Sequence, residues 1–326
     1  MITVPEYYLS FKCIADKCKD SCCIGWEIDV DSEAKAKYKR LGSTLGREIA
    51  EKTQHGYFPL RKNGRCAFLD DGGLCRIISA VGEGYLCDIC REHPRYYGIC
   101  ADGIEGGLGL GCEEAARIIL ESGGSVKLCR TEHTPKYFSE DEYAHFTDKV
   151  RKVIYEKIGE LNVNELIAYL YGLAPEVDGI AFGLCAGNKF TEIPEMIGAT
   201  FDADKTAADL SEFIGLLLEC EALDDEWQKN LDGIGDVKLD CILKSERELK
   251  SLIFYFTHRY VRECTEDMSV GQRILFSLFS SLFIIALSRV MTCEEKEVRA
   301  AVTFSKNIEY STENVDIILD ALSDYL

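Results

Sequence analysis

Proline is scarce in this sequence, with 6 residues among 326. Together with 47% apolar and 29% charged residues, this scarcity excludes a linker or a disordered tail and favours an ordered globular protein. A chain of this length can bury a full core, and either one large or two medium domains are expected.

Basic residues are also few, because 37 Lys and Arg face 56 Asp and Glu and leave a net charge of -19. This balance argues against nucleic-acid binding, which depends on neutralising phosphates, and against anionic membrane surfaces. The longest apolar run, Ile274 to Leu287, spans about fourteen residues, fewer than the roughly twenty that cross a bilayer, so we predict a buried core helix. The first twelve residues lack the pattern of a secretion signal, so a cytoplasmic location is expected.

Cysteine, by contrast, is abundant and unevenly spread. Eleven of the sixteen cysteines fall within residues 1–129, where even spreading would place about six. A reducing cytoplasm disfavours disulfides, so metal or redox chemistry is the favoured explanation of this excess. The isolated cysteines farther along are expected to be small apolar fillers of the core: Cys185, Cys220, Cys241, Cys264 and Cys293.

The cysteines of the first third are spaced as metal ligands. Cys87-x-x-Cys90 places two sulfurs on one turn, and Cys66 and Cys75 lie in a turn-rich region where the backbone can aim side chains at one point. Cys112 begins a predicted helix, where it is an additional ligand, a reactive thiolate or a packing residue. Soft thiolates select zinc or iron–sulfur clusters. The candidate metal ligands are Cys13, Cys18, Cys22, Cys23, Cys66, Cys75, Cys87, Cys90 and Cys112.

Periodicity and capping signals predict a mainly α fold. Residues 27–31 alternate as a short strand, Asp31 caps a helix over 32–53 that is interrupted near Gly42 to Gly46, and another helix follows Cys112. Later helices carry capping boxes at Ser139 with Glu142, Asn162 with Glu165, and Thr292 with Glu295. We therefore expect a cysteine-rich metal-binding or iron–sulfur domain of loops and helices over residues 1–130, and a helical bundle over 131–326.

Several of these stretches resemble a known family. RCAFLDDGGLCRI and CREHPRYY resemble the iron- or zinc-chelating domains named for a CxxCxxCC motif. Within that family, CCIGWEIDVD, LCDICREHPR and GLGLGCEEAARIIL are similar to the flagellin lysine N-methylase group, and the resemblance covers about residues 7–122. The first motif is spaced Cys13-x4-Cys18-x3-Cys22-Cys23, which is wider than the family name describes.

The resemblance implies an enzyme that uses S-adenosylmethionine to methylate lysine side chains of a flagellin-like protein partner, with cysteines holding a [4Fe–4S] cluster. Four thiolates complete one such cluster, so nine candidates imply either two metal sites or cysteines with structural or redox roles. Neither the doubly wound nucleotide fold of common methyltransferases nor the CxxxCxxC triad of radical enzymes is visible, and the cofactor site is therefore unidentified.

Methyl transfer to lysine needs a neutral amine, and deprotonation at pH 7 costs about 4 to 5 kcal/mol. Residues beside Cys90 are the candidates that could assist, although each of them also fits a solvated loop face. The catalytic candidates are Glu92, His93, Tyr96 and Tyr97. Arg91 and Arg95 are candidates for pairing with the carboxylate of S-adenosylmethionine or with a cluster.

Two other functions fit the same residues. One is a non-catalytic zinc- or iron-chelating or redox-sensing module whose helical half binds a partner; structural zinc would then hold the loops folded with a binding energy of order 10 kcal/mol. The other is an iron–sulfur enzyme that performs oxidative or radical modification of a peptide.

Overall fold

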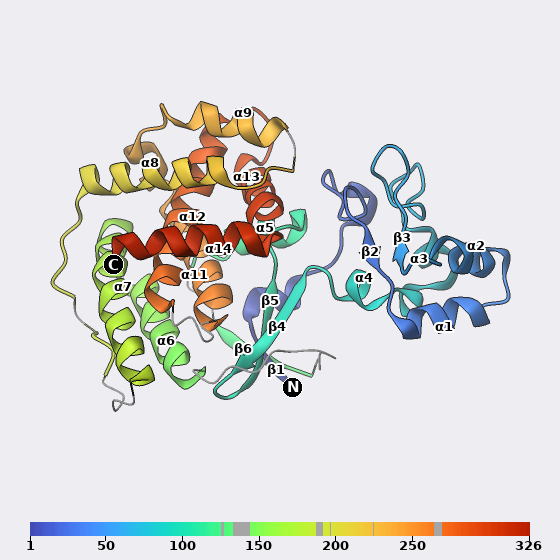
Figure 1. Cartoon of the computed structure of the whole chain (residues 1–326), viewed down its shortest axis with the longest axis horizontal. Coiled ribbons are helices and arrows are strands. Elements are labelled where there is room, and N and C mark those ends of the chain that lie inside the picture. The colour runs from blue at the N-terminus through green and yellow to red at the C-terminus, as the bar shows by residue number, and fades with distance from the viewer. Residues whose placement is uncertain (125–126, 133–143, 187–191, 196, 224, 264–268) are drawn as a thin grey trace.

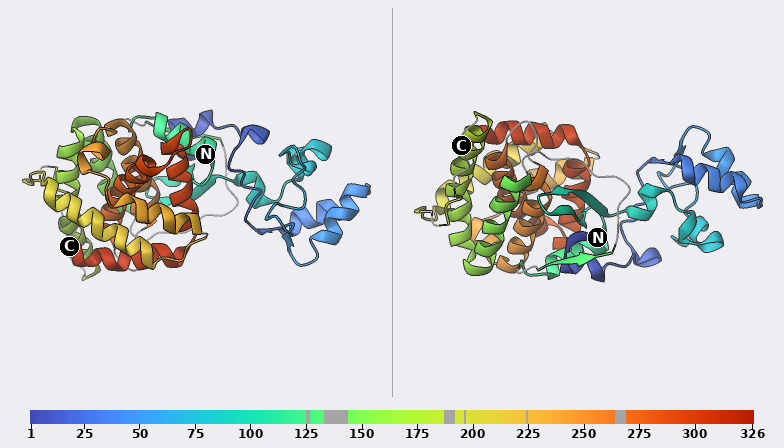
Figure 2. Two further views of the ribbon diagram at one scale, coloured as in Figure 1. Left: turned by 90° about the horizontal axis from the view of Figure 1, so that it is seen from above. Right: turned by 90° about the horizontal axis from the view of Figure 1, so that it is seen from below.

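The computed structural model describes residues 1–124, 127–132, 144–186, 192–195, 197–223, 225–263 and 269–326. The chain forms a large helical lobe and a small lobe of residues 27–93, with residues 13–26, which we call the cysteine loop, between them (Figure 1). Two further views show the small lobe projecting from one end of the large lobe (Figure 2).

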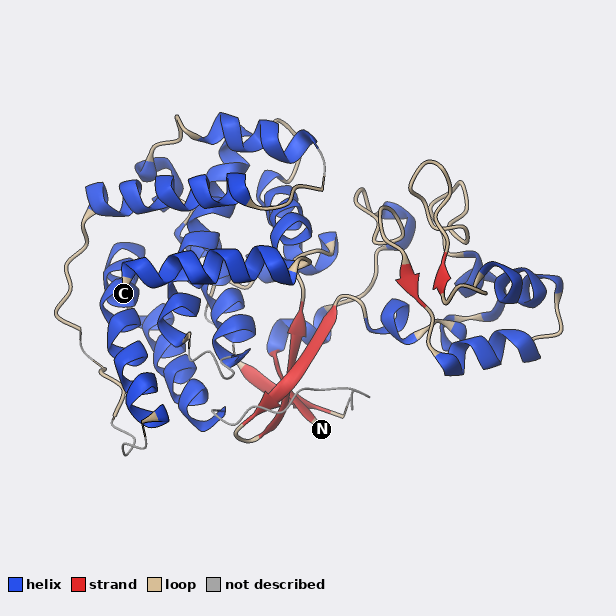
Figure 3. Cartoon of the chain, viewed as in Figure 1, coloured by secondary structure: helices blue, strands red, loops and turns tan. Residues whose placement is uncertain are grey.

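A four-stranded sheet carries the chain between the lobes (Figure 3). Its strands are β1 (Ile2–Pro5), β4 (Arg95–Cys100), β5 (Gly103–Leu108) and β6 (Leu128–Thr131), in the order β4-β5-β1-β6. β4 and β5 form an antiparallel hairpin, β1 runs parallel to β5 with Thr3 beside Glu105, and β6 is antiparallel to β1. The small lobe is therefore an insertion that leaves the large lobe after β1 and returns at β4.

The small lobe follows the predicted signals closely. Its elements are β2 (Ile28–Asp29), α1 (Ser32–Arg40), α2 (Thr44–Lys52), β3 (Tyr57–Phe58), α3 (Arg76–Val81) and α4 (Asp88–Glu92). The Asp31 carboxylate accepts from the Ala34 N–H at 2.8 Å and starts α1, as predicted, and the expected interruption separates α1 from α2. Gly82, at a φ of +86°, ends α3 because few other residues adopt that conformation.

The large lobe is built from helices, which confirms the prediction of a mainly α fold. They are α5 (Glu113–Glu121), α6 (Ala144–Glu160), α7 (Val163–Cys185), α8 (Ala203–Glu219), α9 (Asp225–Ile234), α10 (Leu239–Leu243), α11 (Glu246–Tyr260), α12 (Val270–Val290), α13 (Lys296–Phe304) and α14 (Thr312–Leu322). A π-helical turn, Ser305–Glu309, joins α13 to α14. Short 3-10 turns occur at Glu6–Ser10, Ala15–Lys17, Glu83–Tyr85, Val261–Glu263 and Ser323–Tyr325.

α12 is the central element of the large lobe, and α7, α11, α13 and α14 pack around it. It is long and apolar enough to cross a membrane, but 94% of its most apolar window is buried inside the molecule. The hydroxyls of Ser277 and Ser281 donate to carbonyls one turn earlier, at 2.7 and 2.6 Å, so burial leaves neither hydroxyl unsatisfied. The prediction of a buried core helix is confirmed.

Two hydrophobic cores divide the chain. The smaller one lies within the small lobe and contains residues such as Val30, Phe58 and Phe68. The larger one unites Ile2 to Phe11 with residues from Leu108 to Leu322, because β1 pairs with β5 and β6 while α5 packs on α11 and α13. The predicted domain boundary at residue 130 stays a prediction; the cores group the first eleven residues with the helical part.

Two sequence predictions about helix starts have opposite outcomes. The capping box at Asn162 and Glu165 is present, with both of its hydrogen bonds at 3.1 Å. The one at Thr292 and Glu295 is wrong: α13 starts at Lys296, and Glu295 is its N-cap, in a left-handed conformation, with its carboxylate bonded to Arg117. The box at Ser139 and Glu142 lies outside the described residues.

The isolated cysteines differ from expectation. Cys220 is buried, as a core filler should be. Cys185, Cys241 and Cys293 are exposed, so that prediction is wrong for them: each lies near the end of a helix or in a loop, where an apolar neighbourhood in sequence does not imply burial. Cys264 lies outside the described residues.

The burial of α12 generates a stability prediction. Replacing Phe279, which is fully buried among Tyr171, Phe213 and Tyr325, by alanine should lower the free energy of unfolding by about 3–5 kcal/mol, because a cavity replaces the ring. Phe182→Ala is the matched control, because Phe182 is 76% exposed. It should change the free energy of unfolding by less than about 0.5 kcal/mol. Urea denaturation followed by circular dichroism measures both, and equal effects would contradict the central position of α12.

Candidate metal centre and adjoining pocket

Glu113, the first residue of α5, fastens the cysteine loop to the large lobe. Its buried carboxylate oxygen Oε2 accepts from the backbone N–H groups of Lys19 at 2.7 Å and Asp20 at 3.0 Å. The Cys18 thiol donates to the same oxygen at 3.7 Å. Because Glu113 directly follows Cys112, this contact holds Cys18 beside the start of α5.

Two further contacts dock the cysteine loop on the end of α13 and the π-helical turn. The Asp20 carboxylate pairs with Arg299 at 2.6 Å and with Lys306. The Trp26 ring packs on Tyr310 with 5.1 Å between centroids. Tyr310 also covers Gly111, where an added Cβ would lie 2.4 Å from the Tyr310 ring, so glycine is needed for this approach.

Backbone N–H groups two or three residues onward donate to six of the nine predicted cysteines. The cysteines are Cys13, Cys18, Cys66, Cys75, Cys87 and Cys112. At Cys13 the donor is the Ala15 N–H, with its nitrogen 3.4 Å from Sγ. Cys75, Cys87 and Cys112 are also the N-cap residues of α3, α4 and α5, where helices leave N–H groups unpaired. Such bonds stabilise a thiolate, the form of cysteine that binds metals.

Burial acts against these hydrogen bonds. It raises the pKa of the Cys18 thiol to about 12, and it also raises the pKa of Cys66, Cys75 and Cys112. These thiols therefore stay protonated at neutral pH until a cation compensates their negative charge. A metal ion does so, because its binding releases the thiol protons.

Two pairs of thiols share a proton. The hydrogen bond from Cys22 lowers the pKa of Cys23 to about 7, and the hydrogen bond from Cys90 lowers the pKa of Cys87. The pKa of Cys22 and of Cys90 rises for the same reason. Each pair places a thiol donor beside a sulfur whose pKa that hydrogen bond lowers, an arrangement that suits exchange of the proton for a metal.

The nine predicted ligands lie in two neighbouring groups. The first, which we call the junction group, adjoins the large lobe and consists of Cys13, Cys18, Cys22 and Cys112. The second, the lobe group, lies on the small lobe and consists of Cys23, Cys66, Cys75, Cys87 and Cys90. Sulfurs that are distant in sequence thus approach one another, while their assignment as ligands stays a prediction.

Among the nine candidates, each of which the structure describes, no three sulfurs lie within 4.8 Å of one another, although two pairs are hydrogen-bonded. Across the described residues, the set of three cysteine, histidine or carboxylate ligand atoms within 4.8 Å of one another is Cys100, Glu105 and Asp148. We interpret that set as an ion-pair network, because the buried Arg151 guanidinium bonds both carboxylates and Asp148 also accepts from the Ala101 N–H at 2.9 Å.

The predicted catalytic residues separate into two environments. The Tyr97 hydroxyl donates to Glu92 at 2.9 Å and lies 3.1 Å from the Tyr8 hydroxyl. Burial raises the pKa of Tyr97, so it remains a phenol and is not a base at neutral pH. Tyr96 points to the other side of β4, where Arg259 lies over its ring at 4.9 Å.

His93 and the two arginine candidates are held within the junction. Burial lowers the pKa of His93 to about 4, so the imidazole is neutral, and its Nε2 has no hydrogen-bond partner among the described residues. Arg91 pairs with Asp88 and with Glu92. Arg95 lies over the rings of Tyr8, at 5.5 Å, and Phe11, at 5.2 Å. Their roles in catalysis and cofactor binding stay predictions.

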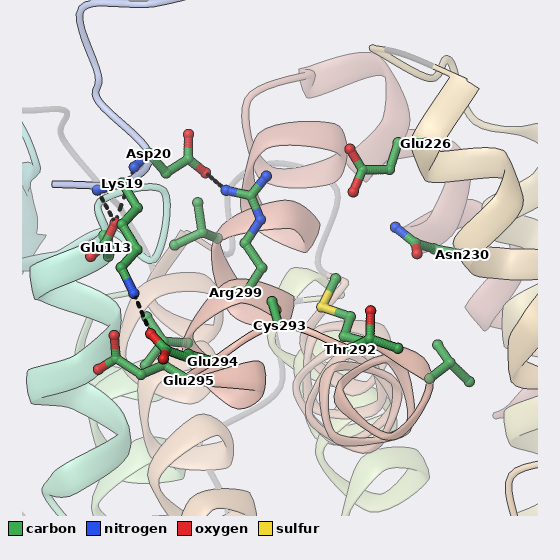
Figure 4. A pocket seen from close by; sticks show the side chains of 14 residues that line it. Lys19, Asp20, Glu113, Glu226, Asn230, Thr292, Cys293, Glu294, Glu295 and Arg299 are labelled. Carbon is green, nitrogen blue, oxygen red and sulfur yellow. Dashed lines mark hydrogen bonds and ion pairs between the residues drawn. The ribbon is translucent and has the colours of Figure 1, made fainter.

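A pocket of about 520 Å³ opens beside the junction group (Figure 4). Lys19, Asp20 and Glu113 lie on one side of it, and Glu226 and Asn230 of α9 lie on the other. Its lining is rich in carboxylates, and Val290, Val298 and Val302 supply apolar surface; the carboxylates are Asp20, Glu113, Glu226, Glu294 and Glu295. Lys19, Arg117, Arg299 and Lys306 pair with four of these carboxylates, so the pocket combines a polar, acidic wall with an aliphatic one.

Asn230 gives the pocket a donor for a ligand. Its Nδ2 is buried and has no hydrogen-bond partner among the described residues. The sequence analysis missed this pocket, because its residues come from the cysteine loop, α5, α9 and the region from α12 to α13. In the sequence, none of these segments differs from an ordinary polar loop or helix face. The Glu113-Glu114 pair indicated only the start of a helix.

The contact made by Glu113 leads to a testable expectation. Glu113→Ala should leave the N–H groups of Lys19 and Asp20 without their acceptor, so their hydrogen exchange should accelerate about tenfold, the equivalent of about 1.4 kcal/mol. Glu114→Ala is the control, because the Glu114 carboxylate pairs with Arg117 in the same helix turn. Amide hydrogen exchange measured by mass spectrometry tests this expectation. Equal protection of the Lys19 and Asp20 amides in both variants would refute this role of Glu113.

Comparisons with known proteins support part of the resemblance. The chain is 29% identical over 140 residues to the lysine-N-methylases of Salmonella typhimurium (strain LT2) and Salmonella choleraesuis (strain SC-B67), covering 39% of this chain and 34% of each relative. It is 29% identical over 140 residues to the flagellar biosynthetic protein FliU of Salmonella muenchen, covering 39% of this chain and 81% of that protein. No family model matches, and neither does any solved structure. The match thus spans about a third of the length of the lysine-N-methylases.

Proposed function

We propose that this protein is a lysine N-methylase that transfers a methyl group from S-adenosylmethionine to lysine side chains of a flagellin-like protein, with a cysteine-bound iron–sulfur cluster at the junction of the lobes. The names of the distant relatives support the reaction and the flagellar partner. The observation that carries the proposal is the pocket beside the junction group: Glu113 lines the pocket, and its Oε2 lies 3.7 Å from the Cys18 sulfur.

The spacing of the sulfurs in the junction group favours a cluster over zinc. A tetrahedral zinc ion with Zn–S bonds of about 2.3 Å brings its sulfurs to about 3.8 Å from one another. No three of the nine candidates, all of which are described, lie within 4.8 Å of one another. A [4Fe–4S] cube binds each thiolate at a different iron, so its four ligand sulfurs lie farther apart than those of a zinc ion. The junction group would hold the cluster through Cys13, Cys18, Cys22 and Cys112, and the bound cluster would supply redox or Lewis-acid chemistry there.

The pocket fits the charges of both reactants. S-adenosylmethionine is a sulfonium, and a lysine side chain is an ammonium on an apolar stem, so both gain from an acidic pocket with aliphatic surface. Its volume of about 520 Å³ is within the range of small-molecule sites. In the reaction, the lysine nitrogen forms a bond to the methyl carbon, the carbon–sulfur bond breaks, and the sulfur keeps the electron pair as a thioether.

The amine must lose a proton before that step. The rim carboxylates bind the charged lysine but also favour its protonated form, whereas contact with Val290, Val298 and Val302 favours the neutral amine. The proton leaves to a rim carboxylate or to solvent. Since Tyr97 stays a phenol, the acceptors that remain among the predicted residues include the Glu92 carboxylate and the neutral imidazole of His93.

One observation favours the second candidate function, a chelating or redox-sensing module. The lobe group belongs to a lobe with its own core, and thiol pairs such as Cys87 and Cys90 suit metal exchange or oxidation without any substrate pocket. The following experiment separates the two functions.

Protein purified without oxygen should contain iron and sulfide and should transfer labelled methyl from S-adenosylmethionine to flagellin lysines. Cys22→Ser should lower this transfer at least about a hundredfold, as expected when one cluster ligand is removed. Cys241→Ser, which changes an exposed cysteine on α10, is the control and should keep full activity. Bound zinc without binding of S-adenosylmethionine would instead support the chelating module.

The acidic pocket generates a prediction about the methyl donor. Glu226→Gln should weaken binding of S-adenosylmethionine about tenfold, about 1.4 kcal/mol, because a carboxylate near a cation is lost. It should affect S-adenosylhomocysteine much less, since its sulfur is uncharged. Glu219→Gln, an exposed glutamate of α8 outside the pocket, is the control. Calorimetry measures both ligands, and equal losses for the two would refute a charge-based role.

A further inference from the structure

We propose that the nine cysteines form two separate metal centres, one in the junction group and one in the lobe group. The inference rests on the iron–sulfur cluster of the proposed function and adds a second centre to it. It follows from the attachment of the two groups to different bodies of the fold, from the number of thiols, and from the small core of the lobe that carries the second group.

The large lobe positions the junction group. Cys112 starts α5 and packs against the large core, and Glu113 bonds the Cys18 thiol at 3.7 Å. Asp20, paired with Arg299 and Lys306, fixes the loop between Cys18 and Cys22 on α13 and the π-helical turn. Cys22 lies two residues after Asp20 and is within electrostatic range of Cys112 and Cys13, so these sulfurs are neighbours.

The small lobe positions the lobe group. Cys87 is fully buried in the small core, and Cys66, Cys75 and Cys90 pack against it. The Cys66 N–H donates to the Cys23 carbonyl at 2.8 Å, and the bridge between Ile24 and Arg65 continues this pairing. Cys23 therefore belongs with the small lobe, although it is next to Cys22 in sequence. After burial, the charge of Cys23 is among the causes that raise the pKa of Cys66 and Cys75.

The adjacent residues Cys22 and Cys23 are the link between the groups. Cys90, which is hydrogen-bonded to Cys87, lies within electrostatic range of both. The two centres are therefore neighbours, one on each side of this pair.

The number of thiols exceeds what a single centre uses. Four thiolates complete a [4Fe–4S] cube or a tetrahedral zinc site. The junction group supplies four, and the lobe group supplies five, of which Cys87 and Cys90 share one proton. A single centre at the junction would leave the five thiols of the lobe group without a ligand role. Three of these lie at the small core and accept backbone hydrogen bonds: Cys66, Cys75 and Cys87.

A metal would add to the stability of the small lobe. Its core contains ten buried hydrophobic residues. Domains of this size bury a small fraction of their surface and commonly rely on metals or disulfides to stay folded. The described cysteines are all free thiols, so a metal is the cross-link that this lobe can form. The lobe centre is then structural, while the junction centre lies beside the pocket.

Metal analysis of matched variants tests the inference. After anaerobic reconstitution with ferrous iron and sulfide, the wild type should hold about eight irons per chain, four for each cube. Cys112→Ser and Cys75→Ser should each lose about half of this iron, the double variant nearly all of it, and Cys241→Ser none. Only Cys75→Ser should also make the small lobe sensitive to protease. Loss of all iron in either single variant, or unchanged iron in one of them, would overturn the two-centre proposal.

A measurement on the wild type keeps the test decisive if a variant fails to fold. Electron paramagnetic resonance of the fully reduced protein should integrate to about two cluster spins per chain, with broadening from the interaction of neighbouring centres. One spin and about four irons per chain would refute a second centre. These readouts do not depend on methyl transfer: a protein with two centres and no methylase activity would refute the proposed function alone.

Discussion

The Glu113 carboxylate is the constraint on which the junction depends. A single buried oxygen accepts two backbone N–H groups and one thiol of the cysteine loop, and Arg117 approaches the other oxygen at 3.4 Å. The carboxylate lies in the first turn of α5, where the helix dipole favours negative charge. Without it, the loop would keep side-chain contacts such as those of Lys19 with Glu294, Asp20 with Arg299 and Trp26 with Tyr310, and the Cys18 thiol would lose its acceptor at the start of α5. The same residue forms part of the pocket wall, so one interaction sets both the position of the thiols and the shape of the space beside them.

The contacts of individual carboxylates explain part of the acidic composition of the chain. Several carboxylates are structural: Asp20 pairs with Arg299, Glu105 with Arg151, and Glu309 accepts from the Tyr255 hydroxyl at 2.7 Å while Arg259 lies 3.2 Å away. Each of these buried or half-buried acids has a cation and a hydrogen-bond donor, as buried charges require. The pocket gathers more of these acids than any of the sites above: five carboxylates and two cations line it, and Arg117 and Lys306 pair with three of the carboxylates from outside the lining.

The sequence predicts local secondary structure well, but it predicts contacts between residues that are distant in sequence poorly. Asp31 as a cap, the break between α1 and α2, and the burial of α12 all follow from short-range patterns, and the structure confirms them. The capping box at Thr292 failed because Glu295 bonds Arg117, 178 residues away in sequence, and tertiary contact outweighs a local signal. The clustering of thiols at short intervals indicated a metal site, but the division into two groups depends on Glu113 and on the bond between Cys66 and Cys23. The pocket gave no signal, since α9 contributes Glu226 and Asn230 from a distant part of the chain.

The insertion of the small lobe between β1 and β4 couples metal binding to the order of the junction. β1 is held on both sides, by β5 and β6, so the chain enters the cysteine loop from a fixed point and returns through β4 to the same sheet. A metal bound by Cys18 and Cys112 would stabilise only those conformations in which the loop is docked on α5. By linkage, every contact that docks the loop, including Asp20 with Arg299 and Trp26 with Tyr310, then strengthens metal binding by the same free energy. The pocket wall formed by Lys19, Asp20 and Glu113 is complete only in that docked state, so occupancy of the proposed junction centre and formation of the proposed reactant site become one equilibrium.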